Sequence, residues 1–298
     1  MNQRFPINPG LFLGVGAYLL WGLMPLYLRL LKDVPATQLL AHRVLWSAVL
    51  LLVVAGVFGR LRTIRAAATG RTLLLLTASA VLIAVNWLVY IWAVQSNRVL
   101  DASLGYFINP LVNVALGMAV LGERIRPVQG FAVALAAAGV AVMALGGGGG
   151  LWISLTLALS FGVYGLIRKT VAIDALGGLL VETLVLAPVA AVVLFLASAA
   201  GEAAFGNTAR IDWLLVLAGA VTAAPLLLFA AAARRLRYAT LGLLQYIGPT
   251  IQFGLAVFLF GERLRLTHIV TFGLIWAGCA IYGWDSWRGS REPAPAPA

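Results

Sequence analysis

Apolar runs of about 20 residues follow one another along the whole chain, with only short connections between them. A run of that length crosses the hydrocarbon core of a bilayer as a single helix, because no water is present there to satisfy an open backbone. The composition agrees, since 62% of the 298 residues are hydrophobic and 10% are charged, whereas about a quarter of a soluble domain is charged. The sequence therefore predicts an all-α integral membrane protein.

Ten transmembrane helices are expected. Their approximate cores are Leu11–Leu31, Leu39–Phe58, Thr72–Val94, Ala102–Leu121, Val128–Leu145, Leu151–Ile167, Gly177–Ala199, Trp213–Ala233, Leu241–Phe260 and Thr267–Trp284. The connections leave no room for a separate soluble domain. The first run lacks a short apolar core followed by an A-x-A-like site, so a cleaved signal peptide is not expected.

The basic residues indicate how the spans are oriented, because Lys and Arg collect in cytoplasmic loops. With the N-terminus inside, 14 of the 21 basic residues fall at inside ends and 7 at outside ends. This bias predicts an even number of spans with both termini cytoplasmic. The net charge of +11 is then a sign of topology, and nucleic-acid binding is not expected. The sequence gives no indication of the oligomeric state.

One sequence unit occurs twice. Residues 102–126 read ASLGYFINPLVNVALGMAVLGERIR, and residues 241–265 read LGLLQYIGPTIQFGLAVFLFGERLR. In each copy a proline, Pro110 or Pro249, precedes the glutamate of Gly-Glu-Arg by 13 positions, and the copies are 139 residues apart. We interpret the Gly-Glu-Arg segments as charged turns at the membrane surface, because glycine suits a helix C-terminus.

The duplication predicts two inverted repeats. Five spans fall on each side of the glycine run at 146–150, and an odd number forces the second copy to enter the membrane from the opposite side. We expect two inverted five-helix repeats around a central cavity, at residues 1–146 and 147–287, with a disordered tail at 288–298 that ends in EPAPAPA. Inverted repeats are characteristic of secondary transporters, although some channels also carry them.

The repeated prolines suggest where a substrate binds. Each proline is expected to kink its helix and to free a carbonyl group. Polar side chains lie beside each kink at helical spacing, and they predict a cavity wall. These candidate substrate-binding residues are Tyr106, Asn109 and Asn113 in the first copy and Gln245 and Gln252 in the second, with Asn86 and Tyr90 of the third span as a further polar face. The alternative is that the amides only join neighbouring helices.

Charged groups within spans are candidates for coupling or gating, because burying them in a membrane is costly. His42 and Arg43 lie about one turn into the second span, and Glu182 lies at the equivalent depth in the seventh. Glu182 is expected to be the only carboxylate inside a span and is the better candidate for a proton carrier. The alternatives are a salt bridge of Glu182 to Arg168 or Lys169, and interfacial or packing roles for His42 and Arg43.

Several segments resemble a known family, the EamA repeats of the drug/metabolite transporter superfamily, and within it the RarD subgroup. The similar segments are AHRVLWS at 41–47, NWLVYIWAV at 86–94, SLGYFINPLVN at 103–113, LGERIR at 121–126, FGVYGLIRK at 161–169, VETLVLAPVA at 181–190 and LGLLQYIGPT at 241–250. The resemblance implies ten spans and an inner-membrane carrier of small molecules, usually an exporter. It does not imply a particular substrate.

The residues do not suggest an enzyme, a cofactor or a metal site. The sequence has no G-x-x-x-x-G-K-[ST] motif for binding ATP phosphates, and two His and one Cys leave no zinc-like spacing. Two function classes therefore remain. The first is a secondary carrier for a small organic metabolite or drug-like compound, with proton coupling through Glu182 as a hypothesis, and the second is an uncoupled channel or facilitator for small solutes.

Overall fold

The computed structural model describes residues 9–122, 126–146, 149–233, 235–236 and 244–289, and every regular element in these ranges is a helix. In chain order they are α1 (Pro9–Leu30), α2 (Ala36–Val57), α3 (Leu61–Ala67), α4 (Gly70–Gln95), α5 (Val99–Leu121), α6 (Pro127–Leu145), α7 (Leu151–Thr170), α8 (Ala175–Ala199), α9 (Ala209–Ala233), α11 (Ile247–Gly254), the π-helical turn η1 (Leu255–Leu259) and α12 (Leu266–Gly289).

Within the described ranges, nine helices are long and apolar enough to span a bilayer, and Ile247–Leu259 forms a shorter apolar helix. These ten segments coincide with the ten expected spans, so the predicted all-α membrane fold is confirmed. The ninth expected span, Leu241–Phe260, is described only from residue 244 onward. The short helix α3 between the second and third spans was not expected.

Local sequence explains where several helices begin and end. Gly122 ends α5 in the left-handed conformation, at φ 65°, which glycine adopts without steric cost. Pro127 is the first residue of α6, a position where its missing N–H group costs nothing. Asp174 precedes α8, and its side chain accepts a hydrogen bond from the Gly177 N–H group.

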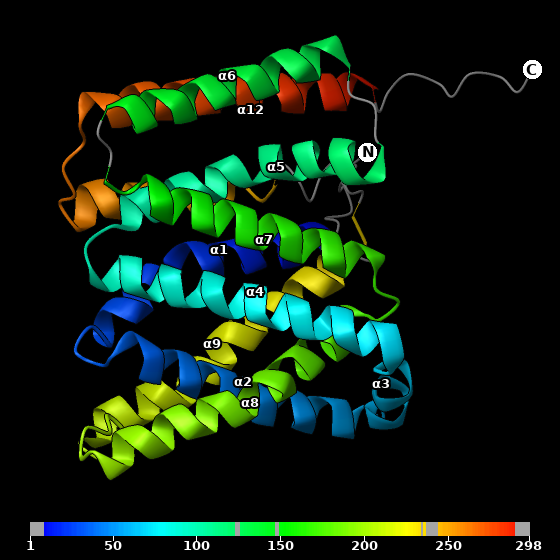
Figure 1. Ribbon diagram of the computed structural model, residues 1–298, viewed down its shortest axis with the longest axis vertical. Helices are drawn as coiled ribbons and strands as arrows, with labels where there is room; N and C mark the ends of the chain where they lie inside the picture. Colours follow the sequence, from blue (N-terminus) through cyan, green and yellow to red (C-terminus); the bar gives the residue numbers. More distant parts are fainter. Residues whose placement is uncertain (1–8, 123–125, 147–148, 234, 237–243, 290–298) are drawn as a thin grey trace, which may run out of the picture.

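The pair α6 and α12 shows that the two halves of the chain are related by symmetry. The two helices lie side by side at one edge of the molecule (Figure 1). A Cβ atom on Gly139 of α6 would lie 3.0 Å from the Thr271 carbonyl oxygen, and one on Gly278 of α12 would lie 2.6 Å from that of Ala132. At an offset of 139 residues, Ala132 and Gly139 of α6 correspond to Thr271 and Gly278 of α12. Exchanging the two halves of the chain therefore turns each of these contacts into the other.

A second pair of glycines repeats this relation between other helices. Gly22 of α1 faces Ile251 of α11, and Gly162 of α7 faces Val112 of α5, with prospective Cβ contacts of 2.9 and 2.6 Å. The first contact becomes the second when equivalent positions are exchanged. In this exchange α1 corresponds to α7, α2 to α8, and α4 to α9. Accordingly, α1 and α2 both pack against α9, and α7 and α8 both pack against α4. The helix packing therefore repeats between the halves.

The equivalent helices α5 and α11 run in opposite directions. Glu262, just beyond η1, accepts hydrogen bonds from the Val99 and Leu100 N–H groups at the start of α5. Further along α5, the Ser103 hydroxyl donates to the Pro249 carbonyl oxygen, near the start of α11. The end of one helix thus lies at the beginning of its counterpart, as an inverted repeat requires. The limits expected for the two repeats, 1–146 and 147–287, stay a prediction.

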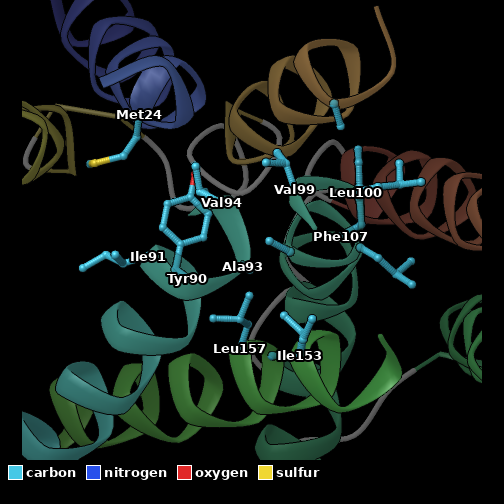
Figure 2. Close-up of a cluster of buried hydrophobic side chains, with 14 of the residues drawn as sticks. Met24, Tyr90, Ile91, Ala93, Val94, Val99, Leu100, Phe107, Ile153 and Leu157 are labelled. Atoms are coloured by element: carbon cyan, nitrogen blue, oxygen red, sulfur yellow. The ribbon is translucent and has the colours of Figure 1, made fainter. Parts of the chain in front are cut away.

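The interior of the bundle is a large apolar cluster between the central helices. Figure 2 shows side chains from α1, α4, α5 and α7 meeting there, among them Met24, Tyr90, Phe107 and Leu157. Many large apolar side chains remain exposed on the described helices, such as Phe195 on α8 and Phe258 on η1. In a bilayer these side chains would face lipid, so the tight packing is confined to the contacts between helices.

Candidate functional site

A buried cation lies between α2, α4 and α9. Arg43 is 3% exposed, its Nε donates to the Thr222 Oγ1 atom at 3.0 Å, and its guanidinium carbon lies 4.9 Å from the centroid of the Trp87 ring. Its Nη1 atom is buried without a hydrogen-bond partner. The hydroxyls of Tyr27, Tyr106 and Tyr90 lie near enough to its guanidinium to interact with it. Among the described residues no carboxylate forms an ion pair with Arg43.

The neighbouring polar side chains of α4 and α5 are only partly satisfied. Asn86 donates to the Leu157 carbonyl oxygen and to the Ser160 hydroxyl of α7, each at 3.0 Å, and accepts from the Tyr106 hydroxyl at 3.2 Å. The rings of Tyr106 and Tyr90 are 5.6 Å apart. The Tyr90 hydroxyl and both polar atoms of the Asn109 side chain are buried without partners. Asn86 therefore joins helices, whereas Tyr90 and Asn109 retain unused hydrogen-bonding capacity.

The polar residues of the second copy lie in different surroundings. Gln252 is buried on α11, where its Nε2 donates to the Trp21 carbonyl oxygen and its Oε1 has no partner. Gln245 is half-buried, just before α11. Asn113 of the first copy is exposed on α5. The structure thus gathers Asn86, Tyr90 and Tyr106 around one contact and leaves the other candidates apart from it, and their roles in binding stay a prediction.

The two repeated prolines occupy different places in their helices. Pro110 lies inside α5, which continues to Leu121. Pro249 is the third residue of α11, in its first turn, where no carbonyl group of the described helix loses its partner. The Pro249 carbonyl oxygen is itself used, because it accepts the hydrogen bond from Ser103. Kinks at Pro110 and Pro249 stay a prediction.

Glu182 of α8 lies in an ion pair with Arg168 of α7. Its Oε1 is 3.7 Å from Nη1 of Arg168 on α7 and also accepts a hydrogen bond from the Ser79 hydroxyl of α4. Its Oε2 accepts from the Tyr164 hydroxyl at 3.4 Å. The Arg168 Nη2 atom donates to the Asp174 carbonyl oxygen at 3.0 Å. Of the two interpretations of Glu182, the salt bridge to Arg168 is the one that the contacts provide.

His42 is not part of the Glu182 cluster. It is buried on α2, with its ring stacked on that of Phe205 at a centroid distance of 5.4 Å and an interplanar angle of 27°. This contact ties α2 to the connection between α8 and α9. It fits the packing role that the sequence left open, and a gating role stays a prediction.

A pocket of about 950 Å³ lies at the end of the bundle where α5 and α12 begin and η1 ends, which we call the Glu262 end. Its lining residues include Arg98, Asp101, Glu262, Arg263, Arg265 and His268. Asp101 is 3.9 Å from His268 and 3.8 Å from Arg98. On the charge-based topology this end faces outward.

Glu262 joins the segment after η1 to the start of α5 at this pocket. Its two oxygens accept from the Val99 and Leu100 N–H groups at 2.7 and 2.8 Å, so the carboxylate caps α5 at its positive end. Burial raises the pKa of Glu262 above 4.5, and the two backbone hydrogen bonds only partly offset this. Nearby, the Arg29 guanidinium donates to Asn97 and lies over the Phe260 ring.

Sequence reasoning overlooked several of these partners. Ser79, Tyr164 and Thr222 are common residue types in helices, and nothing in their spacing marks them. Glu262 did carry a signal, because its Gly-Glu-Arg turn is repeated, but no sequence rule indicates that it caps a helix 163 residues away.

Comparisons with known proteins place these features in context. The EamA-like transporter family model matches residues 8–145. The protein named "Uncharacterized transporter PA0485" in Pseudomonas aeruginosa is 48% identical over 295 residues, 97% of this chain and 98% of that protein. Protein RarD of Escherichia coli K12 is 46% identical over 281 residues, 93% and 94% of the two chains. A crystal structure with 19% identity matches 92% of this chain and 96% of its own at a TM-score of 0.61, which shows a shared fold.

Proposed function

This chain belongs to the EamA-like transporter family and is a multi-pass membrane transporter, and we propose that it moves a small organic metabolite or drug-like compound by alternating access. In this mechanism two repeats exchange conformations, so that one site opens first to one side of the membrane and then to the other. We further propose that it resides in the inner membrane with both termini cytoplasmic, that it works as an exporter, and that it has no enzymatic activity.

The observation that carries the proposal is the exchange of close contacts between the halves. The Gly22–Ile251 and Gly162–Val112 contacts join equivalent positions with the two halves exchanged. A bundle built this way has two arrangements of closely similar packing, one in which each half takes the conformation of the other. A small free-energy difference between two such states is what alternating access requires.

In the proposed mechanism, contacts at the Glu262 end hold that end of the bundle closed and break when it opens. They include hydrogen bonds that join segments far apart in sequence, such as Glu262 to Val99 and Arg98 to the Gly149 carbonyl oxygen. Each such bond contributes roughly 1 kcal/mol net, so these bonds can be exchanged for hydrogen bonds with water at modest cost.

Transport can be tested without knowing the substrate. Proteoliposomes containing only this protein would be loaded with a bacterial metabolite extract, and the solutes that leave faster than from empty liposomes would be identified by mass spectrometry. A carrier is expected to show saturable efflux that the same solute outside accelerates. Flux that rises linearly with concentration and ignores the solute outside would instead favour the uncoupled channel or facilitator.

A further inference from the structure

Arg43 is a buried charge whose surroundings leave it incompletely compensated. Burying an ion without a counter-ion is among the costliest features in a folded protein, and such ions are normally paired. Arg43 has one hydrogen bond to a neutral hydroxyl and one aromatic face beside it. Its seven-residue distance from the start of α2 places it about 10 Å along the helix at 1.5 Å per residue, well inside the span.

Arg168 is a largely buried cation that does have a counter-ion, although its Nη1, like that of Arg43, makes no hydrogen bond. Its guanidinium lies 3.7 Å from the Glu182 carboxylate, and a second nitrogen donates to the Asp174 carbonyl oxygen. The side chain of Arg168 is also 15% exposed. Arg43 has less solvent than Arg168 and no anion, so the difference between them calls for a partner that binds at Arg43.

Buried hydrogen-bonding groups without partners occur on three helices of the bundle. The Arg43 Nη1 atom on α2, the Tyr90 hydroxyl on α4 and the Asn109 amide nitrogen on α5 are buried and unpaired, and all three can donate. Tyr90 lies near enough to Arg43 to interact with its charge, and so does Tyr106, one turn before Asn109 on α5. Buried unpaired groups are rare in native proteins and require an explanation.

We infer that the transported compound is a small organic anion whose carboxylate pairs with Arg43 in the buried site. A carboxylate is planar and accepts two parallel N–H bonds from a guanidinium, which makes this pair stronger than one between neutral groups. The Tyr90 hydroxyl can donate to the same group. An organic cation is disfavoured, because it would meet the like charge of Arg43 without a nearby carboxylate. This inference rests on the transport function proposed above.

The stability of the purified protein tests the inference without a transport assay. The probes are acetate and benzoate, each compared with its neutral counterpart, acetamide or benzamide, at constant ionic strength in detergent. At concentrations about a hundredfold above Kd, a carboxylate is expected to raise the Tm of the wild-type protein by about 5 °C, and its amide is not. Arg43→Gln should abolish this difference, whereas Thr222→Val, which keeps the charge, should retain it.

The variants alone give a second and independent readout. Arg43→Gln removes an unpaired buried charge, so without probe its Tm is expected to equal or exceed that of the wild-type protein. The matched control Arg168→Gln breaks a buried ion pair and is expected to lower the Tm. An Arg43→Gln variant destabilised as much as Arg168→Gln, or carboxylates that stabilise no more than amides do, would overturn the inference. Either result would leave carrier activity in proteoliposomes untouched, so failure of the two proposals is distinguishable.

Discussion

The ion pair between Glu182 and Arg168 can be dissected by a double-mutant cycle. Replacing Arg168 with Gln leaves the Glu182 carboxylate, whose side chain is 1% exposed, without a cation. At the 3.7 Å separation the attraction is about 4.5 kcal/mol for an effective dielectric constant of about 20. Measured losses on breaking buried pairs are about 3–5 kcal/mol, so we expect Arg168→Gln to cost that much in unfolding free energy.

The converse change is expected to cost less. In Glu182→Gln the side-chain oxygen can still accept from Ser79, and Arg168 keeps its bond to the Asp174 carbonyl oxygen and some contact with solvent. We therefore expect a loss of about 1–2 kcal/mol. The double variant should cost about 2–3 kcal/mol, less than the two single losses together, because it leaves no unpaired charge.

Unfolding of the four proteins in mixed micelles, followed by circular dichroism over a denaturant series, measures the cycle. Additive losses, or an Arg168→Gln variant no less stable than Glu182→Gln, would refute the electrostatic argument. The same Glu182→Gln protein also tests coupling in proteoliposomes. If Glu182 carries a proton, accumulation driven by a pH gradient should disappear while substrate exchange continues, and an unchanged pH dependence would leave the residue a purely structural role.

Three further predictions follow from other contacts. Burial raises the pKa of Glu262, so closure of its end should be favoured at low pH and lost as the pH rises through that raised pKa. Maleimide labelling of a cysteine in place of the buried Ser103 (Ser103→Cys) should therefore increase as the pH rises. Adding Glu262→Gln should make this labelling less dependent on pH. Gly278→Ala should lower stability by about 1–3 kcal/mol in a thermal melt, whereas Gly273→Ala on the same helix, with open space around it, should not. Asn113→Ala should raise the KM for transport several-fold with normal membrane insertion if its exposed amide lines the pathway, and an unchanged KM would mean that it faces lipid.

The helices were predictable because their signal is long and redundant. A span needs about 20 apolar residues, so a few exceptions do not obscure it. The inversion was predictable from an odd span count and from charge bias, without any knowledge of contacts. Among the described residues, a shorter apolar helix, Ile247–Leu259, matches the ninth expected span.

The site was less predictable, because its geometry depends on which residues meet across helices. Sequence spacing placed Asn86 and Tyr90 on one face, yet it could not indicate that Asn86 would bond to α7. It identified Arg43 as costly to bury but supplied no partner for it. Both interpretations of Glu182 were open until Arg168 was seen beside it. Contacts between particular side chains of different helices leave no periodic pattern in the sequence, so a single sequence does not reveal them.

The charged side chains distinguish two halves whose backbones pack alike. At an offset of 140 residues, His42 and Arg43 of α2 correspond to Glu182 and Thr183 of α8. Identical halves would give inward-open and outward-open states of equal free energy, because each state would be the other turned over. Under the proposed mechanism, an Arg43 without a counter-ion and a paired Glu182 would remove that equality, and every 1.4 kcal/mol between the states would change their ratio tenfold. Close glycine contacts such as Gly139 to Thr271 are repeated between the halves, so in this mechanism the charges could differ and set the resting state without weakening the packing.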